Sequence, residues 1–215
     1  MSKYGYIGPD SAIPTQAIKS NAGVLTPKEH KDLIKDDKLF IPGLLDLIES
    51  VTADDSVAYY DFDNLGDYNV HFLTANNIQG ASTTAQNLDI RVKVGGTVDS
   101  GANYHFAQQL GNSAGTFSES NATGFNQFIW LSNVDNETNA TANGYAYIYN
   151  AIDNTKYTFG TFQMVVKQDI HTPRMAFGSN AYMSTSACNG LRVFLATTGN
   201  IAEGNISLYG IKAYS

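Results

Sequence analysis

The 215-residue sequence has little cysteine, little charge and no long hydrophobic run. Cys188 is its single cysteine, so no disulfide can form within the chain, which could therefore mature in a reducing cytosol. Charged residues make up 15% of the chain, well below the roughly 25% of an average soluble domain. The polar surface must consist largely of Asn, Thr, Ser, Gln and Gly. No segment approaches the ~18 apolar residues of a membrane span, and residues 1–20 lack the apolar stretch of a secretion signal.

Basic patches are also missing. The chain carries 13 Lys and Arg against 20 Asp and Glu, and its net charge is −7. A nucleic-acid backbone is therefore not an expected partner, and membrane insertion is not expected either. An acidic balance of this size mainly favours solubility.

The sequence contains no catalytic or metal-binding motif that we recognise. No Gly-x-Ser-x-Gly element occurs, and Cys188 has no helix start beside it that would lower its pKa. Acidic pairs such as Asp61 and Asp63 could serve a glycosidase or a calcium site, but their spacing singles out no pair. The four histidines lack the HxH, HxxxH and HExxH spacings of zinc sites: His30, His71, His105 and His171. We expect no catalytic residue, no cofactor and no metal; a glycan-degrading enzyme is the competing class.

From residue 51 onward, the sequence consists of short alternating segments between turns. In LDIRVKV at 88–94, four apolar residues share one face, and Asp89, Arg91 and Lys93 share the other. We expect the apolar set to lie in the core with Phe128 and Trp130, and the polar set to face outward. The core set of this segment is Leu88, Ile90, Val92 and Val94.

Ten strands are expected: 57–62, 68–74, 88–94, 104–110, 127–131, 144–149, 157–167, 174–177, 191–197 and 205–214. No helical pattern interrupts them, which favours a two-sheet sandwich or a barrel, and alternation favours antiparallel pairing. We predict an all-β antiparallel two-sheet β-sandwich. In the last strand the alternation slips at Tyr209–Gly210, which predicts a β-bulge at Gly210.

The first 50 residues differ from the rest. Residues 1–23 have no periodicity and predict an extended arm. Thr26, Pro27 and Glu29 form a capping box with proline at the first helical position, which predicts a helix over 27–35. The apolar cluster at 44–48 predicts either a short helix or a transition into the first strand. The predicted division is an arm at 1–50 and a β-sandwich at 51–215.

An arm of this composition cannot bury enough apolar surface to fold alone. Its apolar residues therefore need a partner surface: Leu25, Leu33, Ile34, Phe40 and Ile41. That surface is either the chain's own sandwich or a neighbouring subunit. We favour the neighbouring subunit, so that the arm serves docking and oligomerisation.

Three tyrosines share one face of the expected strand 144–149. Tyr145, Tyr147 and Tyr149 alternate with Ala146 and Ile148. Such a row could be a half-buried sheet face with hydroxyl groups in water, a platform that stacks on sugar rings, or a subunit interface.

Most of the chain resembles structural proteins of tailed bacteriophages, especially marine and cyanobacterial ones. The matching segments of the β-sandwich module are VAYYDFDNLGDYNVHFLTANNIQ, LDIRVKVGGTVDSGANYHFA and ISLYGIKAYS, and YGYIGPDSAIPTQAIKSNAGVLTPKEHKDLI is similar to leaders of virion proteins. These motifs are patterns of strands and turns, so they transfer no functional residues.

The resemblance implies a jelly-roll-like fold and a non-enzymatic role in the virion, as a capsid decoration protein or a tail-fibre component. Its partners would be other virion proteins, and the protein would be made in the host cytoplasm. A homo-oligomer with cyclic symmetry is expected, with a trimer favoured by family analogy. The alternative function is a carbohydrate-binding module that recognises host surface glycans, with Tyr145, Tyr147 and Tyr149 as the first candidates.

Overall fold

A computed structural model describes residues 27–28, 31–32, 45–137, 139–167, 172–197 and 199–212. The chain divides into two compact units, Met1–Gly43 and Leu44–Ser215. In the first unit, residues 27–28 and 31–32 are helical, at positions where the sequence predicts a helix. The five apolar residues expected to anchor the arm lie outside the described residues: Leu25, Leu33, Ile34, Phe40 and Ile41.

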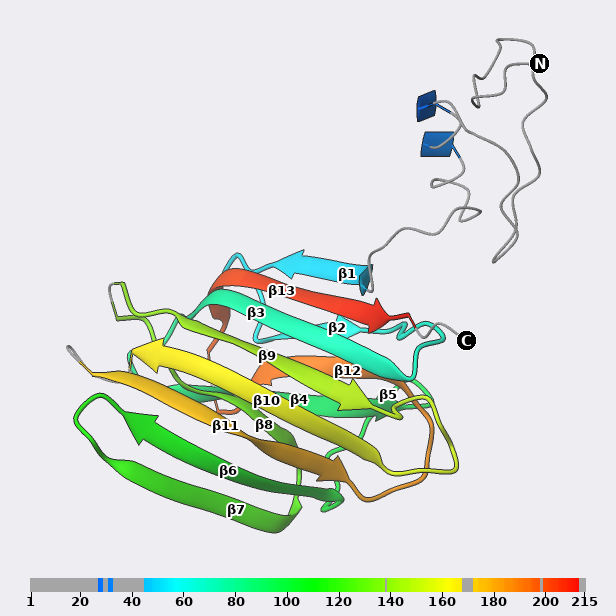
Figure 1. Ribbon diagram of the computed structural model, residues 1–215. Helices are drawn as coiled ribbons and strands as arrows, with labels where there is room; N and C mark the ends of the chain where they lie inside the picture. Colours follow the sequence, from blue (N-terminus) through cyan, green and yellow to red (C-terminus); the bar gives the residue numbers. More distant parts are fainter. Residues whose placement is uncertain are drawn as a thin grey trace, which may run out of the picture. The chain divides into compact units, whose positions relative to one another are not determined.

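The second unit is an all-β sandwich of two antiparallel sheets, as predicted (Figure 1). The eight-stranded sheet has the order β1 (Leu45–Thr52), β13 (Ile201–Ile211), β3 (Val70–Gly80), β9 (Ala142–Tyr149), β10 (Thr158–Lys167), β11 (Pro173–Tyr182), β6 (Tyr104–Asn112) and β7 (Phe117–Phe125). The five-stranded sheet contains β2 (Tyr59–Phe62), β12 (Cys188–Leu195), β4 (Gln86–Val94) and β5 (Thr97–Val98), and β8 (Phe128–Val134) pairs with β4. Many neighbouring strands are distant in sequence, so the chain crosses repeatedly within and between the layers.

All ten predicted strands are present, with shifted ends, and three further strands were not predicted: β1, β5 and β7. The apolar cluster at 44–48 leads into a strand and does not form a helix. Strand β1 pairs with β13 along its length, and Ile48 and Val51 pack against the core. The boundary expected between residues 50 and 51 therefore falls inside β1, and the sandwich starts at about Leu44.

The core between the sheets contains the predicted apolar set. Leu88, Ile90 and Val92 are buried, Val94 is half-buried against them, and Phe128 and Trp130 are buried as well. This confirms the register of β4. Burial of alternate side chains from both sheets supplies the main stabilisation of such a sandwich.

The polar face of β4 is not simply solvent-exposed, and the expectation is wrong for Asp89 and Lys93, which are buried. Between the pairs Ile90↔Phe128 and Leu88↔Leu131, two residues of β8 oppose Asp89 alone. Such a bulge leaves backbone groups without ladder partners. The carboxylate of Asp89 accepts a hydrogen bond from the Trp130 backbone N–H at 3.3 Å, and this explains its position inside the protein.

Lys93 is covered by an ion-pair network on the outer face of the five-stranded sheet. Its Nζ lies 3.1 Å from Asp61 Oδ2 and also contacts the carboxylate of Asp63. Arg192 donates two hydrogen bonds to Asp61, at 2.6 and 2.7 Å, and its guanidinium stacks on the Tyr59 ring at 3.7 Å from the centroid. This outer face is therefore charged and internally paired.

The predicted bulge at Gly210 is also wrong. Gly210 is in register with Asp46 and His71. The irregularities in the pairing of β13 with β3 lie between Ile201 and Asn205, and the extra residue in its pairing with β1 is Ile48 of β1, opposite Leu208 and Tyr209. Glycine is required here for space, because a Cβ atom would overlap the ring of Tyr68. Leu208 and Gly210 are buried while Tyr209 and Ile211 are half-buried, so the alternation of β13 continues through Gly210 without a slip.

Candidate binding surface on the eight-stranded sheet

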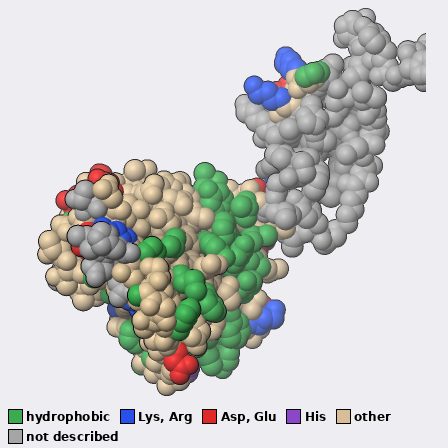
Figure 2. Space-filling view, turned by 60° about the vertical axis from the view of Figure 1, so that its left-hand side comes forward, with side chains coloured by type: hydrophobic (Ala, Val, Ile, Leu, Met, Phe, Trp, Pro, Cys, Tyr) green, Lys and Arg blue, Asp and Glu red, His purple; other side chains and the backbone are tan. Residues whose placement is uncertain are grey.

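The outer face of the eight-stranded sheet is unusually apolar. Among the described residues, eleven large hydrophobic side chains are exposed, and eight of them lie on this face: Leu45, Leu47, Phe117, Tyr145, Phe159, Val165, Met175 and Phe177. Figure 2 shows hydrophobic side chains gathered in a broad band on the surface. Soluble monomers rarely expose large contiguous apolar patches, and those that occur commonly mark binding sites.

Strands β9, β10 and β11 form the middle of this surface, and their outward residues at 143–149, 159–165 and 175–181 carry no charge. Their outward positions carry tyrosine, phenylalanine, valine, methionine and small uncharged polar residues. Charges occur only near the ends of the strands, where Lys167 pairs with Glu137 at 3.2 Å. The contrast with the ion-paired outer face of the other sheet is clear.

The three predicted tyrosines do share this outer face, while Ala146 and Ile148 are buried beneath it. Tyr145 is 39% exposed, and its hydroxyl donates a hydrogen bond to Gln163 Oε1 at 2.7 Å. Tyr147 and Tyr149 are half-buried. Their ring centroids lie 6.3 Å apart, and the Tyr145 and Tyr147 centroids lie 5.9 Å apart.

Two further aromatic residues extend the row across neighbouring strands. The Phe72 centroid of β3 lies 4.8 Å from that of Tyr147 and 6.2 Å from that of Tyr209 of β13. Leu47 of β1 pairs with Tyr209, so the apolar cluster spans four strands. We call these residues the aromatic cluster: Leu47, Phe72, Tyr145, Tyr147 and Tyr209. The sequence did not identify Phe72 and Tyr209, because the pairings β3–β9 and β13–β3 join strands far apart in the chain.

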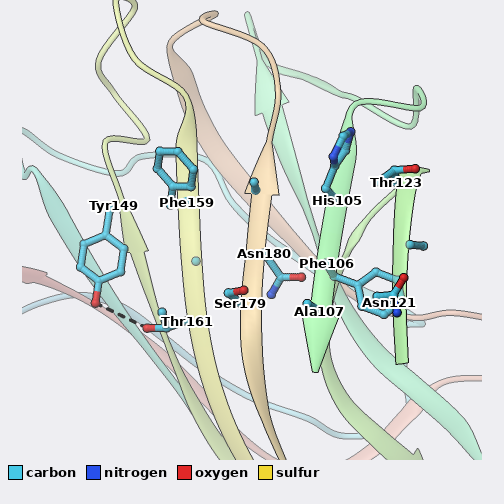
Figure 3. A pocket seen from close by; sticks show the side chains of 13 residues that line it. His105, Phe106, Ala107, Asn121, Thr123, Tyr149, Phe159, Thr161, Ser179 and Asn180 are labelled. Carbon is cyan, nitrogen blue, oxygen red and sulfur yellow. Dashed lines mark hydrogen bonds between the residues drawn. The ribbon is translucent and has the colours of Figure 1, made fainter. Parts of the chain in front are cut away.

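Beside the aromatic cluster, the sheet surface is hollowed. Strand pairing aligns Phe159, Ala181 and His105 in one row, and Thr161, Ser179 and Ala107 in the next. The small side chains in the middle of these rows lower the surface between larger neighbours, which leaves an open hollow of about 460 Å³. Figure 3 shows the ring of Tyr149 beside Phe159 and Thr161 at one side, with His105, Asn121 and Thr123 at the other.

Other candidates for chemistry are less well placed. Within the described part of the chain, no three His, Cys, Asp or Glu side chains converge in an arrangement that could hold a metal ion. Cys188 is buried, and burial raises the pKa of its thiol to about 11, so the thiol is protonated at neutral pH. Asp61 and Asp63 are engaged with Lys93 and Arg192. In the same described residues, no helix has the length and hydropathy needed to cross a membrane.

Comparison with protein-family models and with curated proteins found no match for this chain.

Proposed function

We propose that the protein is a non-enzymatic structural component of a tailed-phage virion, anchored by its N-terminal arm and displaying the β-sandwich. The observation that supports an assembly role is the apolar outer face of the eight-stranded sheet, which carries eight of the eleven exposed large hydrophobic side chains among the described residues. A homo-oligomer or a complex with another virion protein would cover the aromatic cluster and leave the ion-paired face in solvent. The place in a virion comes from the resemblance of the sequence segments.

The aromatic cluster has the composition of a subunit contact. Tyrosine and phenylalanine are enriched at the centres of protein interfaces, where charged residues are depleted. Leu47 and Tyr145 contribute exposed apolar area at its two ends. Closed cyclic symmetry is the expected arrangement of identical subunits, and a trimer is the state that we propose by analogy with phage fibres and decoration proteins.

Immunogold labelling of purified particles that carry an epitope-tagged copy of the chain tests the proposal. Label over the capsid would identify a decoration protein, and label on the tail would identify a fibre component. Particles that are complete but carry no label would contradict the virion role. The tag belongs on the five-stranded sheet, such as in the exposed Gly95–Gly96 turn between β4 and β5, so that the apolar face stays unchanged.

The second candidate function is binding of carbohydrate, and the hollow beside the aromatic cluster is the observation that favours it. Of the three predicted tyrosines, only Tyr149 lines this hollow. The site that we consider for a glycan therefore differs from the tyrosine row that the sequence indicates.

A further inference from the structure

We propose that the hollow over β9, β10, β11, β6 and β7 is a binding site for a neutral saccharide. This inference goes beyond the virion role and does not depend on it. It rests on the shape of the hollow, the arrangement of aromatic and polar groups around it, and the absence of charge among the described residues that line it.

The shape suits a sugar ring. The hollow measures about 460 Å³, within the roughly 300–1,000 Å³ of small-molecule sites. Its floor consists of Ala107 of β6, Ser179 of β11 in register with it, and Ala181 on the same face of β11. Because these side chains are short, a ring can approach the backbone of the sheet while larger residues flank it.

One side of the hollow is aromatic. Phe159 is 45% exposed, and Tyr149 pairs with it across β9 and β10. Figure 3 shows both rings nearly face on in a view onto the strands. The face of an aromatic ring is electron-rich, and the C–H groups on one face of a pyranose are apolar and weakly positive, so the two surfaces are complementary.

The remaining sides carry uncharged hydrogen-bonding groups. Ser179, Asn121 and Thr123 are exposed, and their side chains make no hydrogen bond to any described residue, as is also true of His105. Thr161 has only a 3.4 Å contact with the Tyr149 hydroxyl. These hydroxyl, amide and imidazole groups can donate to and accept from sugar hydroxyl groups, which act in both ways.

The charge of the protein selects against acidic ligands in the hollow. The chain has a net charge of −7, yet the described residues that line the hollow include no Asp, Glu, Lys or Arg. A sialylated or uronic-acid glycan would find no cation there to compensate its carboxylate, and the overall negative field would oppose its approach. A neutral hexose or N-acetylhexosamine fits this chemistry.

The site is open, so each copy binds weakly, and several copies in one oligomer would raise the apparent affinity. The full-length protein is therefore tested first on an array of neutral and acidic oligosaccharides. The neutral oligosaccharide that gives the strongest signal is then titrated against the wild type and its variants by NMR chemical-shift changes. We expect neutral glycans to bind in preference to their acidic counterparts.

Two variants alter the hollow in opposite ways. Phe159→Ala removes the stacking surface, and Ala107→Trp fills the floor without removing a polar partner. Each should weaken binding about tenfold or more. Val165→Ala is the matched control, because Val165 is 50% exposed on the same face of the same strand and lies outside the hollow; its binding should stay at the wild-type level.

Three results would overturn the proposal: no neutral glycan bound, binding unaffected by both hollow variants, or equal loss in the Val165→Ala control. Light scattering on the same samples tests the main alternative, in which the hollow is a contact between subunits. If no glycan binds and Ala107→Trp dissociates an oligomer, the hollow is a subunit contact. Labelling of particles gives an independent answer on the virion role, so the two proposals can fail separately.

Discussion

Gln127 Nε2 donates a hydrogen bond of 2.5 Å to Oδ2 of Asp89, a carboxylate that is fully buried. Arg91 fixes the amide in this orientation, because its Nη2 donates to Gln127 Oε1 at 3.0 Å. Burial raises the pKa of Asp89 to about 7, and the hydrogen bonds from Trp130 and Gln127 oppose part of this effect.

This pKa predicts a fall in stability as the pH rises. The unfolded chain loses the Asp89 proton near pH 4, whereas the folded protein retains it up to about pH 7. The free energy of unfolding should therefore decrease across this window, by on the order of 3 kcal/mol between pH 4.5 and 8 from this residue. Urea unfolding at both pH values should show a clearly smaller decrease for Asp89→Asn than for the wild type.

The control for this prediction is Asp67→Asn, which removes an exposed carboxylate and should keep the wild-type dependence. His71 has the opposite effect on the pH dependence of stability. Burial lowers its pKa, so the stability that this residue contributes is lost as the pH falls below about 6.5. Because His71 is present in all three proteins, its contribution cancels when the pH dependence of a variant is compared with that of the wild type. Equal pH dependence in all three proteins would contradict the assignment to Asp89.

Val92→Asp should destabilise the sandwich by about 3 kcal/mol or more, because it places a charge without a partner in the core. Val92 is 0% exposed. Val165→Asp is the matched comparison on the outer face, where the carboxylate remains in water, and should change the free energy of unfolding by less than about 1 kcal/mol. Chemical denaturation followed by circular dichroism measures both. Similar losses for the two variants would be inconsistent with the observed register.

Local alternation was sufficient to predict the fold class and the ten strands, since period-2 patterns report which side chains face the core. The strand β7, FSESNATGF, was missed because it is mostly polar and pairs at an edge of the sheet. Asp89 and Lys93 could not be placed from sequence, because their burial depends on the β8 bulge and on Asp61 of a distant strand. The hollow could not be predicted from the sequence either, because it depends on the register in which β10, β11 and β6 pair.

A charge within the aromatic cluster should disrupt the proposed subunit contact. Tyr145→Lys introduces an ammonium group that would lose water on association without gaining an anionic partner. The dissociation constant of the oligomer should rise at least tenfold, as measured by light scattering over a dilution series. Tyr157→Lys is the control, because Tyr157 is similarly exposed, 41% against 39%, but lies in the turn before β10. An oligomer that tolerates Tyr145→Lys would exclude this cluster from the contact.

The position of β1 determines how the N-terminal arm should be tested. Truncation at residue 50 would remove most of β1 and its ladder with β13, so a loss of assembly could reflect a damaged sheet. Truncation after Gly43 retains the complete compact unit that starts at Leu44. The two truncated proteins therefore separate the role of the arm from the role of the strand.

Deletion of residues 1–43 should leave the denaturation midpoint close to that of the full chain, because the core residues of the sandwich all lie in the retained unit. The truncated protein should nevertheless fail to join the oligomer or the particle, since it lacks the proposed anchoring residues: Leu25, Leu33, Ile34, Phe40 and Ile41. Deletion of residues 1–50 should lower the midpoint as well, because β13 then loses its neighbour on the edge of the sheet. Light scattering and incorporation into particles report assembly, and urea unfolding reports the fold. If the protein lacking residues 1–43 assembles like the full chain, the arm is not the anchor, and the contact on the eight-stranded sheet is sufficient for assembly.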